Sequence, residues 1–65
     1  MTNIDEFTYQ AQLLMEMDIE LNEHLDYDAN DYYEVTLERF DEDLSDQEIA
    51  QVKHLIEEEY LRLFV

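Results

Sequence analysis

The first fourteen residues carry apolar side chains at steps of three and four. These positions fall on one side of a helix: Ile4, Phe7, Ala11 and Leu14. Asn3, just before them, is of a type that often caps a helix N-terminus, and the acidic Asp5 and Glu6 suit the positive end of a helix dipole. The pattern predicts a helix over about residues 4–13.

Between residues 15 and 22 the period changes to two. Apolar and polar side chains alternate there: Met15, Met17, Ile19 and Leu21 with Glu16, Asp18, Glu20 and Asn22. A second alternation follows: Tyr33, Val35 and Leu37 with Glu34, Thr36 and Glu38. Period two is typical of a strand with one buried face, and Tyr, Val and Thr favour strands. The two runs predict an antiparallel hairpin with the stretch DYDAND at its tip, because Asp and Asn are common turn residues.

A helical interpretation of residues 14–25 stays open beside the strand. Met, Glu and Leu are good helix formers. Four apolar residues would then continue the first helix: Leu14, Met17, Leu21 and Leu25. This alternative gives an all-α protein.

The last third of the chain has a clear helix signature. Ser45 and Glu48 have the spacing of a capping box, in which the two side chains bond backbone N–H groups that the start of a helix leaves free. Leu44 and Ile49 have the spacing of a hydrophobic staple. An apolar stripe follows: Ile49, Val52, Ile56, Tyr60 and Leu63. These features predict a helix over residues 46–63.

Together these segments predict a single domain, residues 1–65, of the α+β class. Its order is α-β-β-α, with two helices packed on a two-stranded antiparallel hairpin that needs such cover to be stable. Some apolar residues fall off the main stripes: Leu13, Leu61, Phe64 and Val65. A homodimer would bury them and cover a sheet edge, so we expect self-association.

The charge of the chain is its most unusual property. It has 19 Asp and Glu but only three Lys and Arg, for a formal net charge of -16. Such a charge excludes direct binding to nucleic acid or to an anionic membrane, and it favours basic protein surfaces or metal cations. Solubility in a small domain needs a net charge of only about 2 to 8 in magnitude. The excess therefore points to a function.

The composition also limits the class of protein. The chain has no Cys, which excludes disulfides and Cys-based zinc sites. No apolar run approaches the roughly 20 residues of a membrane span. The acidic start MTNIDEF is unlike a secretory signal. We therefore expect a soluble protein of the cytoplasm.

The stretch DYDAND partly matches a calcium-binding loop. Asp26, Asp28 and Asn30 fall at the first, third and fifth positions of that pattern. The pattern fails at Asp31, where it needs Gly, and at Leu37, where it needs a bidentate Glu. A turn explains the stretch better than a specific cation site does.

Other candidate chemistry is weak. His24 and His54 are 30 residues apart and lack the spacing of a metal-binding motif. There is no Cys nucleophile, and Ser45 is explained by its role as a cap. We expect no enzyme activity, no metal site and no cofactor.

On the hairpin, the acidic residues would form one continuous row. Glu16, Asp18 and Glu20 would point to one side of the first strand, and Glu34 and Glu38 would share that face from the second. Two clusters would extend the row at its ends: Asp26, Asp28 and Asp31, and Asp41, Glu42 and Asp43. A regular row of negative oxygens presents to Lys and Arg what a phosphate backbone presents.

The segments MEMDIELNE, DYDANDYYE and FDEDLSDQE resemble the small, acidic, Cys-free DNA-mimic proteins, many of them phage-encoded. Within that class the chain is similar to phage inhibitors of the histone-like nucleoid protein HU. The resemblance implies a protein that binds the basic DNA-binding surface of a host protein and competes with DNA. Tyr27, Tyr32 and Tyr33 would then serve as anchors beside the acidic residues, with a place in the core as the alternative for Tyr33.

Two other functions stay open. An immunity protein or antitoxin that neutralises a basic nuclease would use the same charge. A cation-binding module would use the carboxylates to hold a metal ion.

Overall fold

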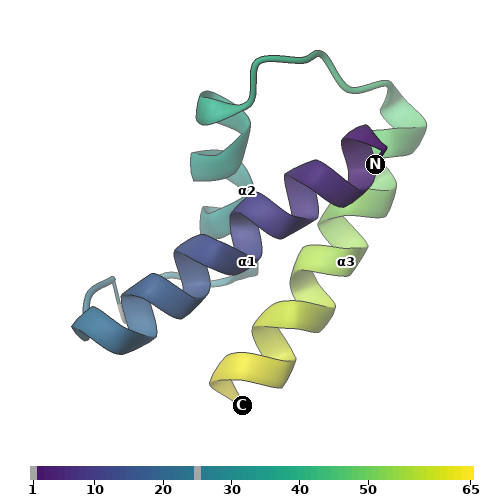
Figure 1. Cartoon of the computed structure of the whole chain (residues 1–65). Helices are drawn as coiled ribbons and strands as arrows, with labels where there is room; N and C mark the ends of the chain where they lie inside the picture. Colours follow the sequence, from purple (N-terminus) through teal and green to yellow (C-terminus); the bar gives the residue numbers. More distant parts are fainter. Residues whose placement is uncertain (1, 25) are drawn as a thin grey trace.

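The computed structural model describes residues 2–24 and 26–65, and these form three helices (Figure 1). They are α1 (Asn3–Leu21), α2 (Ala29–Arg39) and α3 (Asp46–Phe64). Each helix packs against the other two. In Figure 1, α1 and α3 run from the upper right toward the lower part of the view, and α2 starts behind α1 and continues to the upper left. The fold is all-α.

The prediction of an α+β fold with a two-stranded hairpin is wrong. The described residues 2–24 and 26–65 contain no strand, and both segments with alternating polarity are helical. Residues 15–21 continue α1, and residues 33–38 lie inside α2. The open alternative, a continued first helix, agrees with the structure as far as Leu21; Leu25 lies outside the described residues.

Local propensity and burial explain the correction for α1. Five of the seven residues from 15 to 21 are Met, Glu or Leu, which favour helix. Met15 and Asp18, three residues apart, are the buried ones in this segment, whereas Met17, Ile19 and Leu21 are exposed. The apolar half of the alternation is therefore not a buried face, and burial follows the helical period instead.

The start of α2 explains the second correction. Asp28 is the N-cap, and its side chain accepts a hydrogen bond from the backbone N–H of Asp31. The Asp31 side chain accepts one in return from the backbone N–H of Asp28. This capping box begins a helix at the place where a hairpin tip was expected. Tyr32, Tyr33 and Thr36 are the buried residues of α2, at helical rather than strand spacing.

Helices are present at both ends of the chain, where the sequence predicted them. The capping box of Ser45 and Glu48 is present, and α3 ends one residue beyond the predicted 63. At the N-terminus, Thr2 rather than Asn3 is the cap, because its hydroxyl accepts from the backbone N–H of Asp5. Helix α1 also runs eight residues past the predicted end at 13 and stops at Asn22 in the left-handed conformation.

The core lies where the three helices meet. Its buried members come from all three: Phe7, Ala11, Met15, Tyr32, Tyr33, Val52 and Ile56. The ring of Phe7 packs against Tyr33 and, edge to face, against Phe40, which follows α2. Four aromatic residues, called here the aromatic cluster, contact one another at the other end of the bundle: Tyr27, Tyr32, Tyr60 and Phe64. Aromatic packing thus joins both ends of α2 to its neighbours.

None of the three described helices is long and apolar enough to cross a membrane.

Candidate functional site

The acidic side chains cover the outside of the bundle. Of the nineteen, fifteen are exposed, three are half-buried and one is buried. They lie on all three helices and in the segments between them. The excess negative charge is therefore available to a partner on more than one side of the protein.

The structure divides the predicted row of carboxylates between two helices. Glu16 and Glu20 are exposed one turn apart on α1, and Glu34 and Glu38 are exposed one turn apart on α2. Within each pair the Cα atoms lie about 6 Å apart along the helix axis, because each residue rises about 1.5 Å. The prediction of one row on a hairpin face is therefore wrong, and the exposed carboxylates form two separate helical pairs instead.

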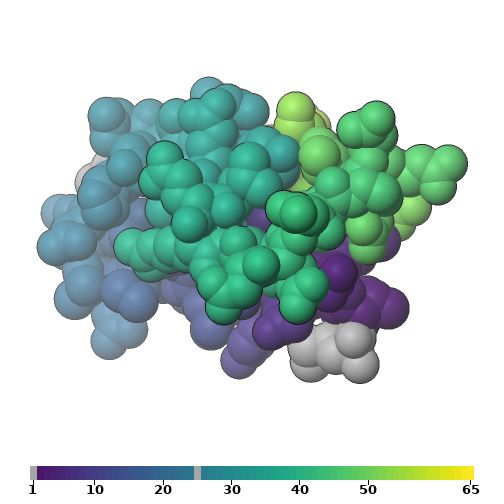
Figure 2. Space-filling model, turned by 90° about the horizontal axis from the view of Figure 1, so that it is seen from above, coloured from purple at the N-terminus to yellow at the C-terminus, as the bar shows by residue number. Residues whose placement is uncertain are grey.

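The second pair continues into the loop after α2. Asp41, Glu42 and Asp43 are exposed there, beginning two residues after the helix ends. In the space-filling view from above, α2 and this loop stand together at the front (Figure 2). We call the five residues the α2 acidic face: Glu34, Glu38, Asp41, Glu42 and Asp43.

The cluster from DYDAND has a structural role. The carboxylates of Asp28 and Asp31 accept the hydrogen bonds that cap α2, at 3.0 and 2.9 Å. Of the three predicted partner-binding residues in this stretch, Asp26 is exposed and has no capping role. DYDAND therefore leads into a helix, with Asp28 as the N-cap and Ala29 as the first residue of α2, and it is not a hairpin tip.

Asp18 is not on the surface. Only 6% of the residue is exposed, and its Oδ2 accepts a 2.8 Å hydrogen bond from the Tyr32 hydroxyl. Its Oδ1 lies 3.1 Å from Nδ1 of His24, which donates a hydrogen bond to it when protonated. Both carboxylate oxygens thus have partners inside the protein, so Asp18 is unsuited to contact a binding partner.

This network changes the acidity of both partners of Asp18. The hydrogen bond with Asp18 raises the pKa of His24 above 6.5; desolvation lowers this pKa in part, and the charges of Asp18, Glu23 and Asp26 add to the rise. Burial raises the pKa of the Tyr32 phenol, and its hydrogen bond to Asp18 raises it further. At neutral pH the Tyr32 hydroxyl therefore keeps its proton and acts as a donor.

Asp18, Glu23 and His24 could also be read as metal ligands, because their donor atoms lie within 4.8 Å of one another. Glu23 and His24 are exposed, and the buried Asp18 is already bonded to Tyr32 and His24. Hydrogen bonding accounts for this arrangement without an ion.

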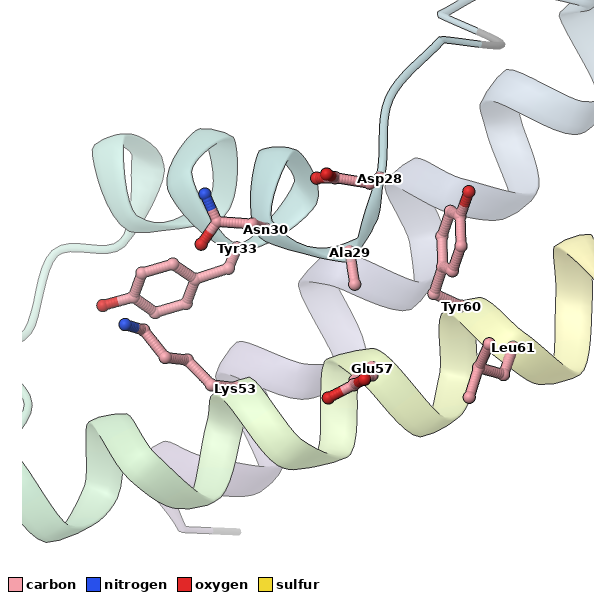
Figure 3. A pocket seen from close by; sticks show the side chains of 8 residues that line it. All are labelled: Asp28, Ala29, Asn30, Tyr33, Lys53, Glu57, Tyr60 and Leu61. Carbon is pink, nitrogen blue, oxygen red and sulfur yellow. The ribbon is translucent and has the colours of Figure 1, made fainter.

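A groove of about 420 Å³ separates the start of α2 from the second half of α3 (Figure 3). Eight residues line it: Asp28, Ala29, Asn30, Tyr33, Lys53, Glu57, Tyr60 and Leu61. The ammonium of Lys53 lies 5.0 Å from the centroid of the Tyr33 ring, a cation–π contact. These eight residues include no Ser, Cys or His, so the groove has no Ser–His or Cys–His pair.

The few basic side chains are partly engaged within the protein. Arg62 donates a 2.6 Å hydrogen bond to Glu59, one turn before it on α3. Lys53 packs on Tyr33, as described above. Arg39 is exposed in the last turn of α2, where a cation suits the helix dipole. The basic residues therefore do little to interrupt the negative surface.

The tyrosines predicted as anchors are mostly internal. Tyr32 and Tyr33 belong to the core, and Tyr27 is half-buried beside them. Tyr9 is 53% exposed and was not singled out in the sequence. The sequence signal for its exposure was that Tyr9 and Leu13, four residues apart, both lie outside the apolar stripe of the first predicted helix.

No family model, curated protein or solved structure matches this chain.

Proposed function

We propose that this protein is a DNA mimic that binds the basic DNA-binding surface of a host protein and competes with DNA for it. A nucleoid protein such as HU is the favoured target. The observation that carries the proposal is the exposure of fifteen of nineteen acidic side chains on a small three-helix scaffold. A surface of this kind attracts Lys and Arg as a polyphosphate does.

Repulsion between neighbouring carboxylates lowers the stability of the fold, and a role in binding explains why the chain carries so many of them. Glu16 and Glu20 are like charges four residues apart on a helix, as are Glu34 and Glu38. Each such pair destabilises its helix by about 0.2–0.5 kcal/mol. A neutral residue or a cation at one position of each pair would remove this penalty.

Two surfaces are the proposed contact regions. The first is the α2 acidic face, and the second is the pair Glu16 and Glu20 on α1, with Asp26 in the segment after that helix. Long-range attraction brings a basic partner onto these carboxylates, and hydrogen-bonded pairs with Lys and Arg then replace its contacts with phosphate. Asp18, Asp28 and Asp31 are left out because they stabilise the fold.

The test is an affinity pull-down from bacterial lysate with the tagged protein at low salt, followed by elution first with a salt gradient and then with duplex DNA. The proposal expects an abundant basic DNA-binding protein that DNA releases. Glu34→Lys combined with Glu38→Lys, or Glu16→Lys combined with Glu20→Lys, is expected to reduce its retention. Glu57→Lys combined with Glu58→Lys makes the same change in net charge at exposed positions of α3, outside both surfaces, and is the control.

Other outcomes would redirect the assignment. Retention of one nuclease that DNA cannot displace would replace DNA mimicry with an immunity function. A shift in thermal stability with calcium, seen by circular dichroism, would indicate a cation-binding module. Full retention by both charge-reversed variants would remove the two surfaces from the proposal.

A further inference from the structure

The outer side of α1 carries an apolar stripe that no other helix of the structure covers. Tyr9, Leu13, Met17 and Leu21 follow one another at steps of four residues and are 53%, 44%, 50% and 55% exposed. Residues four apart are neighbours on a helix surface, so the four side chains form one ridge about 18 Å long. We call it the α1 stripe.

A groove runs beside the α1 stripe, between α1 and α2. It has a volume of about 220 Å³ and is lined by six residues: Gln10, Leu13, Leu14, Met17, Thr36 and Arg39. Leu13 and Met17 therefore belong to both the stripe and the groove. A ridge beside a groove offers a partner helix both a surface to lie on and a hollow for its side chains.

Carboxylates lie along the side of the α1 stripe opposite the groove. Glu16 lies three residues after Leu13, and Glu20 lies three residues after Met17; both acidic side chains are exposed. Residues three apart on a helix are neighbours, so each carboxylate stands beside an apolar side chain of the stripe. The surface is thus apolar in the middle and negative along one edge.

We propose that the α1 stripe and its groove bind an amphipathic helix of the partner, one with an apolar face flanked by Lys or Arg. This inference rests on the proposed function, because it names the kind of segment that a basic partner would present. Apolar residues on the partner helix would cover Leu13 and Met17, and its cations would pair with Glu16 and Glu20. Met side chains adapt to varied apolar surfaces, which suits such a contact.

Charge argues for this occupant over a second copy of the chain. Each copy carries a formal net charge of -16, and a two-fold pairing through α1 would bring two sets of Glu16 and Glu20 to one interface. Like charges that face each other across an interface suppress association. A basic helix meets the same carboxylates with opposite charge.

The test uses two synthetic peptides of about 18 residues that contain only Leu and Lys and have the same composition as each other. One has Leu on a single helical face, and the other is scrambled so that no apolar face forms. Binding to the full chain is measured by fluorescence anisotropy at about 0.05 M and about 0.5 M NaCl, because high salt screens exposed charge pairs but not apolar contacts. At the higher salt the amphipathic peptide is expected to bind at least about tenfold more tightly than the scrambled one.

Matched variants locate the contact. Leu13→Gln combined with Met17→Gln is expected to weaken binding of the amphipathic peptide about tenfold. Ile19→Gln is the control, because Ile19 is 44% exposed on α1 but lies outside the stripe and its groove. Circular dichroism checks that each variant is folded. Equal loss from Ile19→Gln, or equal binding of the two peptides at high salt, would overturn the inference.

Two further results separate this inference from the proposed function. If Glu16→Lys with Glu20→Lys weakens both peptides at low salt while the Leu13 and Met17 variant weakens neither, the acidic surface binds basic partners and the stripe has no part in it. If neither peptide binds at low salt, the acidic surface itself fails as a binding site. A homodimer in sedimentation analysis that Leu13→Gln with Met17→Gln converts to monomer would assign the stripe to a second copy and overturn the proposal.

Discussion

The hydroxyl of Tyr32 on α2 donates a 2.8 Å hydrogen bond to the carboxylate of Asp18 on α1, and this bond lies inside the protein. It joins residues fourteen apart in the sequence and fixes the start of α2 against the end of α1. A buried carboxylate is expensive unless its oxygens have partners, so the two residues depend on each other.

Replacing Tyr32 by Phe is therefore expected to lower the free energy of unfolding by about 2 kcal/mol, because it leaves one oxygen of a buried carboxylate without its donor. Urea unfolding followed by circular dichroism measures the change. Tyr9→Phe removes the same hydroxyl from an exposed ring and should alter stability by less than about 0.5 kcal/mol. Equal effects of the two substitutions would show that the bond does not stabilise the fold.

Stability is expected to depend on the protonation of His24. Its hydrogen bond with Asp18 raises the pKa of His24 in the folded state above 6.5, so the protonated form binds its surroundings more strongly than in the unfolded chain. This contribution is fully present below the unfolded pKa of about 6.5 and is lost as the pH rises through the higher folded pKa.

The effect is isolated by comparison with a variant, because lower pH also reduces the repulsion among the carboxylates. Urea midpoints at about pH 6 and about pH 8.5 should differ more in the wild type than in His24→Gln. His54→Gln serves as control, since His54 pairs with the exposed Glu58 on the outside of α3 and is itself 70% exposed in its side chain. An unchanged pH dependence in His24→Gln would contradict the assignment.

The capping residues should affect stability without affecting partner binding. Asp28→Ala and Ser45→Ala each remove the side chain that caps a helix, and each is expected to cost about 1 kcal/mol of unfolding free energy. Asp43→Ala removes the same charge as Asp28→Ala from an exposed loop, with an expected change below about 0.5 kcal/mol. If Asp43→Ala weakens retention of the partner more than Asp28→Ala does, the separation of binding and capping carboxylates is supported; the reverse order would contradict it.

Replacing Glu38 is expected to change stability and partner binding in opposite directions. Glu38→Lys replaces repulsion by attraction four residues after Glu34, near the C-terminal end of α2, and should raise the free energy of unfolding by about 0.5–1 kcal/mol. The same substitution should weaken binding of a basic partner. Glu38→Gln is the intermediate case in both measurements. A variant that gains stability and keeps full binding would show that this carboxylate has no role in recognition.

The sequence predicts α3 well because several local signals agree there. Ser45 and Glu48 mark its start, and the apolar stripe keeps the helical period to its end. In α1 the signals conflict beyond residue 14, since exposed Met17, Ile19 and Leu21 imitate the alternation of a strand. In α2 the residues Tyr, Val and Thr favour a strand, so the sequence predicted a strand where a helix forms. The capping box of α2 was missed because it is made of two Asp residues in place of the more usual Ser and Glu.

The surface is more predictable than the network beneath it. Acidic side chains are rarely buried, so the exposure of most of the nineteen follows from residue type. The burial of Asp18 does not follow in that way, because it requires a donor from another helix. The α1 stripe also depends on the fold, since Met17 and Leu21 join the helix of Tyr9 and Leu13 only once the hairpin is excluded.

The aromatic cluster gives this protein a built-in optical probe. The chain has no Trp, so its near-ultraviolet circular dichroism comes from Tyr and Phe. Tyr32 packs against Phe64, and Phe64 stacks on Tyr60 with ring centroids 4.9 Å apart, so the rings near the end of α3 share one asymmetric environment with the start of α2. A state that keeps its helices but loses this packing would lose the near-ultraviolet signal while keeping the far-ultraviolet one. Separation of α3 from α2 is thus visible in the unlabelled protein.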